Sequence, residues 1–410
     1  MAGNSNEFKP SELASAMQLR TRKEKGFDDI ESGLTLAKSS SIPLAQDKSG
    51  FTGWLDRLNI FRPFSKPVTE DDVVWLLDNT AYRSSQSQAW QAEFVAAVFE
   101  REDKQKLMDM VTGVVRAVGL ADDAAERKTV EERLLPFLWN VRPARTIAAT
   151  HQSKQLKLGP SNVNGISSNV FKVSDSSGGS LVKMSAEIGG GQGSIASMQT
   201  YYAGDDGWGI ISDIDDTIKV TMTSDPVGIL CETFINPPRP IEGMPELYAG
   251  IRSALPEDTA WFYLSASPYN LYPFLKEFRK QHYPSGTLIL RDSSWKTVAG
   301  LLSALTYGTE EYKVDRMKKI HTWLPRKKMI VIGDSTQSDP EAYGYMYRAV
   351  PGWIQLILIR KATKVAEYGI DEKNKPERFE KAFKDIPRRA WHVFEDPSEC
   401  LDIVKKAMEG

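Results

Sequence analysis

The sequence has few cysteines, few histidines and no long apolar run. Its 410 residues include 2 cysteines and 4 histidines. Cys231 and Cys400 lie far apart with no metal-ligand spacing around them, which is typical of a protein from a reducing compartment. No stretch of about 18 apolar residues occurs, so no membrane-spanning helix is predicted and membrane contact would be peripheral. Residues 1–10 have no apolar core and predict no secretory signal.

The sequence also lacks an excess of charge of either sign. Its 52 Lys and Arg residues against 54 Asp and Glu give a net charge of −2, which argues against a nucleic-acid-binding protein. The hydrophobic fraction of 41% is ordinary for a globular protein. At about 100–200 residues per domain, the length suggests two or three domains.

The first 68 residues have little to form a core. Residues 1–48 are polar and Ser-rich, so we expect them to be mostly disordered. Residues 49–68 form a linker or an amphipathic segment, because Trp54, Leu58 and nearby apolar residues recur at helical spacing beside basic ones. Such a helix would lie at a membrane interface or pack on the domain that follows.

Residues 69–207 indicate a β-sandwich-like domain with a helical insertion at about 103–140. In Leu181–Ile188, apolar and polar residues alternate, as in a half-buried strand, and glycines flank the run. Two other apolar runs, Val73–Tyr82 and Trp90–Phe99, fit a strand or a helix. The insertion includes an amphipathic helix with apolar positions Leu107, Met110, Val111, Val114, Val115 and Val118.

From residue 208 to 410, short apolar runs alternate with helical patterns. This order predicts an α/β, Rossmann-like domain with a parallel sheet that is covered on both faces. Ligands of such sheets bind at the carboxyl ends of the strands. The predicted strands are Trp208–Ser212, Ala260–Leu264, Thr287–Leu290, Met329–Ile332 and Ile354–Ile359, and the predicted helices are Leu271–Lys280, Thr297–Leu305 and Lys313–Trp323.

Polar groups suited to phosphate chemistry follow three of these strands. Asp-x-Asp-x-Thr at 213–217 follows the first, Ser265 the second, and Gly-Asp-x4-Asp at 333–339 a later one. Lys313 lies near the start of a helix between the last two. A lone Asp-x-Asp is usually a turn, but the four motifs in this order are highly specific.

The motif order resembles that of the haloacid dehalogenase-like phosphatases. The words SDIDDTIK at 212–219, FYLSASP at 262–268 and GMPELY at 243–248 are similar to the fungal actin-patch phosphatidate phosphatase family. Upstream, DNTAYR at 78–83 and AEFVAA at 92–97 are similar too. The resemblance therefore covers about residues 69–402 and implies a haloacid dehalogenase-type catalytic domain.

The resemblance also implies the roles of the site residues, which agree with the chemistry of an anionic ester. Asp213 would attack phosphorus, Asp215 would act as general acid and base, and Ser265 and Lys313 would contact the phosphoryl group. Thr217 would shape the loop. The implied cofactor is Mg2+, a hard cation that suits oxygen ligands. Its expected ligands are Asp213, the backbone carbonyl of Asp215, Asp334 and Asp339, while Asp216, Ser267 and Arg291 are further candidates for the site.

A segment between the first two motifs favours a lipid substrate. Residues 225–238 are apolar and Pro-rich, which we interpret as a mobile flap beside an open site. Its apolar side chains would either enter the acyl chains or pack on the protein. The basic clusters at 326–328 and 388–389 would attract anionic lipid or form ordinary solvated faces.

The sequence thus predicts a magnesium-dependent phosphatidate phosphatase that releases diacylglycerol and phosphate through an aspartyl-phosphate. The alternatives are a phosphatase of the same mechanism acting on a soluble phosphometabolite or phosphoprotein, and a non-catalytic lipid-binding scaffold. The expected location is cytoplasmic, with peripheral membrane association. Resemblance to the family implies cytoskeletal or endocytic partners, although no Pro-rich tail follows residues 391–394.

Overall fold

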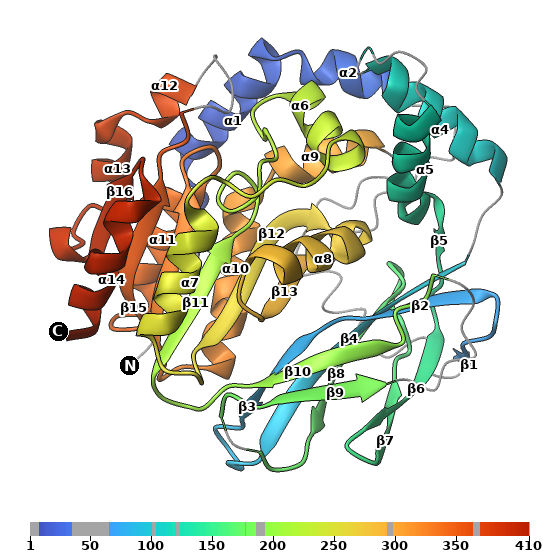
Figure 1. Ribbon diagram of the computed structural model, residues 1–410, viewed down its shortest axis with the longest axis horizontal. Coiled ribbons are helices and arrows are strands. Elements are labelled where there is room, and N and C mark those ends of the chain that lie inside the picture. The colour runs from blue at the N-terminus through green and yellow to red at the C-terminus, as the bar shows by residue number, and fades with distance from the viewer. Residues whose placement is uncertain are drawn as a thin grey trace.

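The chain forms a β-rich domain and an α/β domain, preceded by two N-terminal helices (Figure 1). This computed structural model describes residues 8–34, 65–100, 104–117, 119, 124–176, 178–185, 193–292, 298–363 and 370–409. The predicted amphipathic run at 51–61 and the glycines at 189–191 lie outside these residues. None of the helices within these ranges has the length and apolar character to cross a bilayer.

Two helices occupy the beginning of the chain, where disorder was expected. They are α1 (Glu12–Glu24) and α2 (Phe27–Leu34), and Ser11 caps α1 by accepting from the Ala14 N–H. The prediction of disorder is therefore wrong for residues 8–34. The composition is polar because few side chains of this segment are buried, but Met17 and Phe27 pack against the rest of the protein.

The β-rich domain contains ten strands in one hydrogen-bonded path with side branches. The path runs β1-β6-β9-β10-β3-β4-β2, while β5 and β8 pair with β4, and β7 pairs with β6. The sandwich-like arrangement stays a prediction. The strands are β1 (Lys66–Pro67), β2 (Asp72–Leu76), β3 (Asn79–Arg83), β4 (Trp90–Glu100), β5 (Asn140–Val141), β6 (Arg145–His151), β7 (Lys154–Leu158), β8 (Ile166–Lys172), β9 (Leu181–Ser185) and β10 (Ser197–Tyr202).

The two ambiguous runs form three largely buried strands: the first run contains β2 and β3, and the second is β4. In β2, Val74 and Leu76 join the core of the β-rich domain, whereas Val73 and Trp75 join a core shared with the helices. Because both faces need apolar residues, the run lacks the alternation that identifies a half-buried strand. The helical insertion lies between β4 and β5 and consists of α4 (Lys104–Ala117) and α5 (Ala124–Leu138).

The α/β domain is built on a six-stranded sheet in which all neighbours are parallel. Its strand order is β13-β12-β11-β14-β15-β16. The predicted α/β architecture is confirmed, while its superfamily assignment stays a prediction. The strands are β11 (Trp208–Asp213), β12 (Ala260–Pro268), β13 (Thr287–Arg291), β14 (Lys328–Asp334), β15 (Ile354–Arg360) and β16 (Trp391–Phe394).

Helices cover both faces of this sheet, so its strands are apolar on both sides. One core combines Ile210 and Ile330 with α7, α8 and α14, and another combines Ile211 and Val331 with α10, α11 and α13. The helices are α7 (Met244–Ala254), α8 (Tyr272–His282), α9 (Val298–Thr306), α10 (Thr309–Trp323), α11 (Asp339–Ala349), α12 (Ile370–Lys373), α13 (Pro376–Ala382) and α14 (Cys400–Glu409), with short 3-10 turns at Tyr269–Leu271, Arg388–Ala390 and Pro397–Glu399.

The segment expected to be a mobile flap is a packed helical element. It contains α6 (Pro226–Leu230) and the π-helix η2 (Cys231–Ile235). Ile229, Leu230 and Phe234 are fully buried, so these side chains pack on the protein. From α5, Arg133 donates to the Thr233 carbonyl at 3.2 Å and the Asn236 carbonyl at 2.7 Å. The flap interpretation is therefore wrong, because the apolar residues form a core contact.

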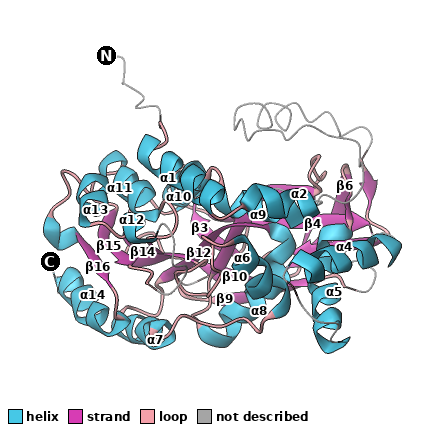
Figure 2. Ribbon diagram, turned by 90° about the horizontal axis from the view of Figure 1, so that it is seen from above, coloured by secondary structure: helices cyan, strands magenta, loops and turns pink. Residues whose placement is uncertain are grey.

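The N-terminal helices lie over the carboxyl-end edge of the parallel sheet. Figure 1 shows α1, α2 and α6 above the ends of the strands, and α1 again overlies this region in the view from above in Figure 2. The Gln18 amide donates to the Thr309 hydroxyl at 2.8 Å and the Ser338 hydroxyl at 2.9 Å. Helix α1 therefore contacts the first residue of α10 and the N-cap of α11.

Candidate active site

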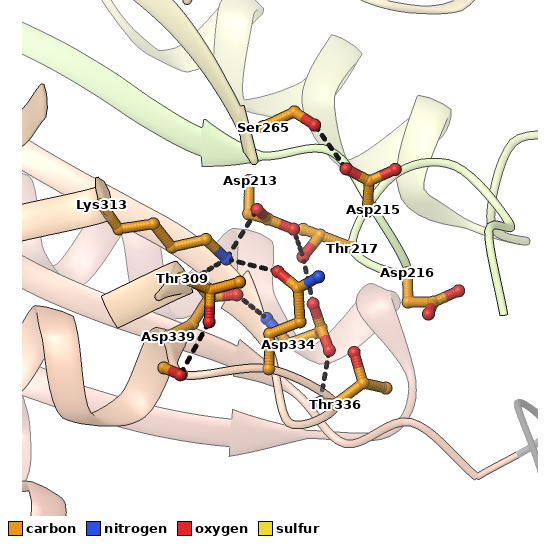
Figure 3. A network of polar contacts seen from close by, with 12 residues as sticks. Asp213, Asp215, Asp216, Thr217, Ser265, Thr309, Lys313, Asp334, Thr336 and Asp339 are labelled. Atoms are coloured by element: carbon orange, nitrogen blue, oxygen red, sulfur yellow. Dashed lines mark hydrogen bonds and ion pairs between the residues drawn. The ribbon is translucent and has the colours of Figure 1, made fainter. Parts of the chain in front are cut away.

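The four predicted motifs converge at the carboxyl ends of β11, β12 and β14 (Figure 3). Asp213 is the last residue of β11, Asp334 is the last of β14, and Asp339 is the first of α11. Since parallel strands end at the same edge, residues more than a hundred positions apart meet there. Asp213, Asp334 and Asp339 each offer a carboxylate oxygen, and these oxygens lie within 4.8 Å of one another.

Lys313 and Thr217 connect these carboxylates. The Lys313 ammonium lies 2.8 Å from Asp213 Oδ1 and pairs with Asp339, and it donates to the Gln337 side-chain oxygen at 3.2 Å. The Thr217 hydroxyl is 2.9 Å from Asp213 Oδ2 and 3.0 Å from Asp334 Oδ2. The predicted nucleophile, lysine and acidic residues therefore form one group of contacts.

Backbone contacts hold the two acidic residues of the last motif. The Asp334 N–H donates to Asp339 Oδ2 at 3.1 Å, and the Thr336 N–H donates to Asp334 Oδ1 at 2.5 Å. A Cβ on Gly333 would lie 2.6 Å from Asp339 Cγ. Glycine is therefore required before Asp334, because any side chain would displace the Asp339 carboxylate.

Burial and mutual repulsion dominate the electrostatics of the site. Burial raises the pKa of Asp213 well above its usual range, although Lys313 opposes this effect. Burial, followed by the charge of Asp339, also raises the pKa of Asp334. Burial alone would lower the pKa of Lys313, but the charges of the surrounding carboxylates outweigh it and raise that pKa. The lysine is therefore a permanent cation, and it contacts two of three buried acids.

This imbalance of charge fits a divalent cation. Three buried carboxylates with one contacting lysine leave uncompensated negative charge, which is costly in a protein interior. All ligand atoms offered are carboxylate oxygens, the type preferred by Mg2+. Asp213, Asp334 and Asp339 would hold the ion. The Asp215 side chain lies outside this cluster, and the role of its carbonyl as a ligand stays a prediction.

Asp215 is held on the other side of Asp213 by hydroxyl groups. Ser265 donates to Asp215 Oδ2 at 2.5 Å, and the Ser267 hydroxyl is 3.4 Å from the same oxygen. Thr221 donates to Asp215 Oδ1 at 2.9 Å. Ser265, expected to contact the phosphoryl group, is thus bonded to the expected general acid in this structure.

Two other candidate residues have structural contacts. The Asp216 carboxylate accepts from the backbone N–H groups of Thr221, Met222 and Thr223. Arg291 donates to the backbone carbonyls at 307 and 308. These contacts account for both side chains without a ligand.

Sequence reasoning missed several residues of this site. Gln337 contacts Lys313 from an unspecified position inside the Gly-Asp-x4-Asp motif, and Thr221, which lies outside the motifs, contacts Asp215. Lys373 from α12 donates to the Thr336 carbonyl at 2.7 Å, and burial lowers its pKa to about 8. Spacing gives no signal for such residues, because they reach the site only through the tertiary fold.

The site is closed in this structure, contrary to the expectation of an open one. Asp213, Ser265 and Lys313 are 0% exposed, and Asp215 is 2% exposed. The basic cluster at 326–328 ends at the first residue of β14, and the cluster at 388–389 precedes β16. Both therefore lie at the amino-end edge of the sheet, away from the carboxylates. Arg326 also pairs with Asp205 and Asp206. These clusters therefore do not surround the site.

The geometry agrees with comparisons to known proteins. Residues 208–361, which contain all the motifs above, match the family model described as Phosphatidate phosphatase APP1, catalytic domain. This part of the chain is therefore similar to the catalytic domain of the APP1 phosphatidate phosphatases. The sequence is 27% identical over 206 residues to Phosphatidate phosphatase APP1 of Saccharomyces cerevisiae. The aligned region covers 50% of this chain and 31% of that protein. The chain thus matches about a third of the length of this curated relative.

The APP1 match ends at residue 361, so it includes β11–β15 but neither the β-rich domain nor α1 and α2. The resemblance inferred from the motifs is therefore confirmed for residues 208–361. All four motifs in this chain lie inside the matched residues, whereas Gln18 and Lys373 lie outside them.

Proposed function

We propose that this chain is a magnesium-dependent phosphatidate phosphatase that uses Asp213 as its nucleophile. The observation that carries the proposal is the position of Asp213. It is buried, it contacts Lys313, and it belongs to an acidic cluster with Asp334 and Asp339 inside the region that matches the APP1 catalytic domain. The lipid substrate is supported by the family and by the name of the yeast relative. The packed apolar side chains of α6 and η2 add no support for it.

In the first step, an Asp213 oxygen attacks phosphorus and the ester oxygen leaves. Asp215, as the carboxylic acid, gives its proton to that oxygen, which releases diacylglycerol and leaves an aspartyl-phosphate. A bound Mg2+ would neutralise phosphoryl oxygens that otherwise repel the carboxylate. Lys313 would bind another phosphoryl oxygen as a fixed cation and hold Asp213 in line with phosphorus.

In the second step, water attacks phosphorus and the bond to Asp213 breaks. Asp215, now a carboxylate, takes a proton from this water, so both side chains return to their starting states. Ser265 donates to Asp215 in this structure and would donate to the phosphoryl group once substrate replaces that bond. Thr217 holds the Asp213 carboxylate in its orientation.

The proposal includes a cytoplasmic location with peripheral membrane contact, because phosphatidate lies in a bilayer. Cytoskeletal or endocytic partners are proposed from the family resemblance alone. The closed site adds a requirement: residues above the carboxyl ends must move before a head group reaches Asp213.

A direct assay tests this function. Purified protein should release phosphate from phosphatidate in mixed micelles with Mg2+, and EDTA should stop the release. Asp213→Asn and Asp215→Asn should each lose activity by about a thousandfold or more. A strong preference for a soluble phosphomonoester would favour the alternative of a soluble substrate, and an inert protein that still binds Mg2+ would favour the scaffold.

A further inference from the structure

The loop after Asp213 folds into a tight hook that is closed by one carboxylate. Asp216 has a φ of 58°, in the left-handed region, which turns the chain back. Its carboxylate accepts from the N–H groups of Thr221 at 2.9 Å, Met222 at 2.8 Å and Thr223 at 2.7 Å. The hydroxyl of Thr223 adds a further bond at 2.6 Å. The hook therefore fixes the backbone of residues 221–223 beside residue 215.

This hook brings the Thr221 hydroxyl against the expected general acid. Thr221 Oγ1 lies 2.9 Å from Asp215 Oδ1, and both residues are at most 2% exposed. The Lys219 ammonium lies 3.3 Å from the same hydroxyl and donates to the Val220 carbonyl at 2.8 Å. A lysine can only donate, so its ammonium occupies a lone pair of the Thr221 oxygen. The hydroxyl proton then has two acceptors, and Asp215 Oδ1 at 2.9 Å is nearer than the Lys219 carbonyl at 3.4 Å.

The two carboxylate oxygens of Asp215 thus accept hydrogen bonds from different donors, and substrate binding would displace the donor at Oδ2 but not the one at Oδ1. Oδ2 is held by Ser265, which the proposed reaction moves to the phosphoryl group, and by a longer contact of 3.4 Å from the Ser267 hydroxyl. Oδ1 is held by Thr221, which belongs to the hook and has no role in binding phosphate. When substrate arrives, Thr221 is the contact that keeps the carboxyl group from rotating.

We propose that Thr221, oriented by Lys219 and the Asp216 hook, is the positioning residue for proton transfer by Asp215. This inference rests on the proposed function, because it assigns Asp215 as general acid. The backbone bond from Thr221 to Asp216 closes the loop in any case, so the hydroxyl has a separate role. Removing the hydroxyl while keeping the side-chain shape separates that role from loop closure.

Leaving-group dependence gives a test that a purely structural role would not satisfy. An alkyl ester needs a proton on its leaving oxygen, whereas p-nitrophenolate leaves without one. Thr221→Val should therefore lower single-turnover cleavage of phosphatidate and of a soluble alkyl phosphate by about tenfold or more. The p-nitrophenol burst should change less than about twofold, KM should stay constant, and Thr221→Ser should retain most of the wild-type rate.

Each other outcome is informative. An equal loss on alkyl and aryl esters, or no loss on either, would overturn the positioning role. If the wild-type protein cleaves soluble alkyl phosphate but not phosphatidate, the lipid assignment fails while the effect of Thr221 is still decided. Inertness toward every ester would overturn both. Should Thr221→Val fold poorly by circular dichroism, Thr221→Ala in the same comparison decides the question.

Discussion

At the residue scale, Asp213 lies among more negative than positive charge. Asp334 and Asp339 surround it, and Lys313 is the cation that contacts the group. Folding brings these carboxylates together, and they repel one another. A bound divalent ion removes this repulsion and therefore stabilises the folded protein.

Mg2+ should therefore raise the melting temperature of the wild-type protein. At a hundredfold excess over Kd, binding to the folded state alone stabilises by about 2.7 kcal/mol. Asp334→Asn removes one ligand charge and should reduce this shift markedly, measured by calorimetry with and without EDTA. Asp371→Asn, at an exposed position, should keep the full shift. An unchanged shift in Asp334→Asn would place the ion elsewhere.

Glu310 should make stability depend on pH. Burial raises the pKa of Glu310 to about 7, against a lowering effect of the Ser11 N–H. A folded pKa above the unfolded one means that the stabilisation is complete below about pH 4.5 and is lost as pH rises through about 7. Glu310→Gln should therefore be more stable than wild type at pH 8, by about 2 kcal/mol, and equal to it near pH 4.5.

Urea denaturation at several pH values checks this expectation. The exposed neighbour Glu311 provides the control, since Glu311→Gln should not reproduce the pH-dependent gain. A constant difference between Glu310→Gln and wild type at all pH values would contradict the shifted pKa.

At the scale of elements, α1 and α2 are integral to the fold. Phe27 is 0% exposed and belongs to the largest core, and the buried Arg22 donates to Thr306 at 2.6 Å. Phe27→Ala should therefore lower the free energy of unfolding by about 3 kcal/mol. Leu19 on the outer side of α1 is 56% exposed, so Leu19→Ala is the matched control. If neither Phe27→Ala nor Leu19→Ala changed the thermal denaturation of the protein, the N-terminal helices would not pack against it in solution.

The elements differ in how well the sequence predicts them. The β11–β15 strands are apolar runs between helical patterns, so periodicity and order are enough to locate them. Helix α1 has few buried positions, and its contacts, such as Gln18 with Thr309, are nearly 300 residues distant in sequence. Residues 225–238 are hard to interpret for a related reason. Their apolar side chains indicate burial, but the sequence does not show whether they are buried in a membrane or against the protein.

The site shows the same division. Asp213, Lys313, Asp334 and Asp339 could be predicted because motif order carries the information. The contact of Thr221 with Asp215 could not, since it depends on the left-handed turn at Asp216. No residue pattern near 216 requires that turn.

At the scale of the whole molecule, the β-rich domain is joined to the α/β domain through buried charges. Asp78 after β2 lies 2.8 Å from the Lys276 ammonium and 3.8 Å from Arg279 Nη2, both on α8. Tyr272 accepts from the Asp78 N–H at 2.7 Å. This contact lies beside the sheet that carries the site, so the β-rich domain covers one side of the α/β domain.

Asp78→Ala should destabilise the protein by about 3 kcal/mol, because it leaves the buried Arg279 without its charged partner. Chemical denaturation measures the loss. Asp206→Ala removes a surface ion pair with Arg326 and should leave the melting temperature unchanged. Similar effects of the two substitutions would contradict a structural role for the Asp78 contact.

The most direct measurement uses phosphatidate labelled in its phosphate group. The reaction with the protein is quenched with acid within one turnover, and the labelled peptide is mapped. If the Asp213 carboxylate bonds covalently to phosphorus, the labelled phosphoryl group should be found on Asp213. This labelling should require Mg2+ and should be absent from Asp213→Asn. Label on another residue, or turnover without any labelled protein, would contradict the account.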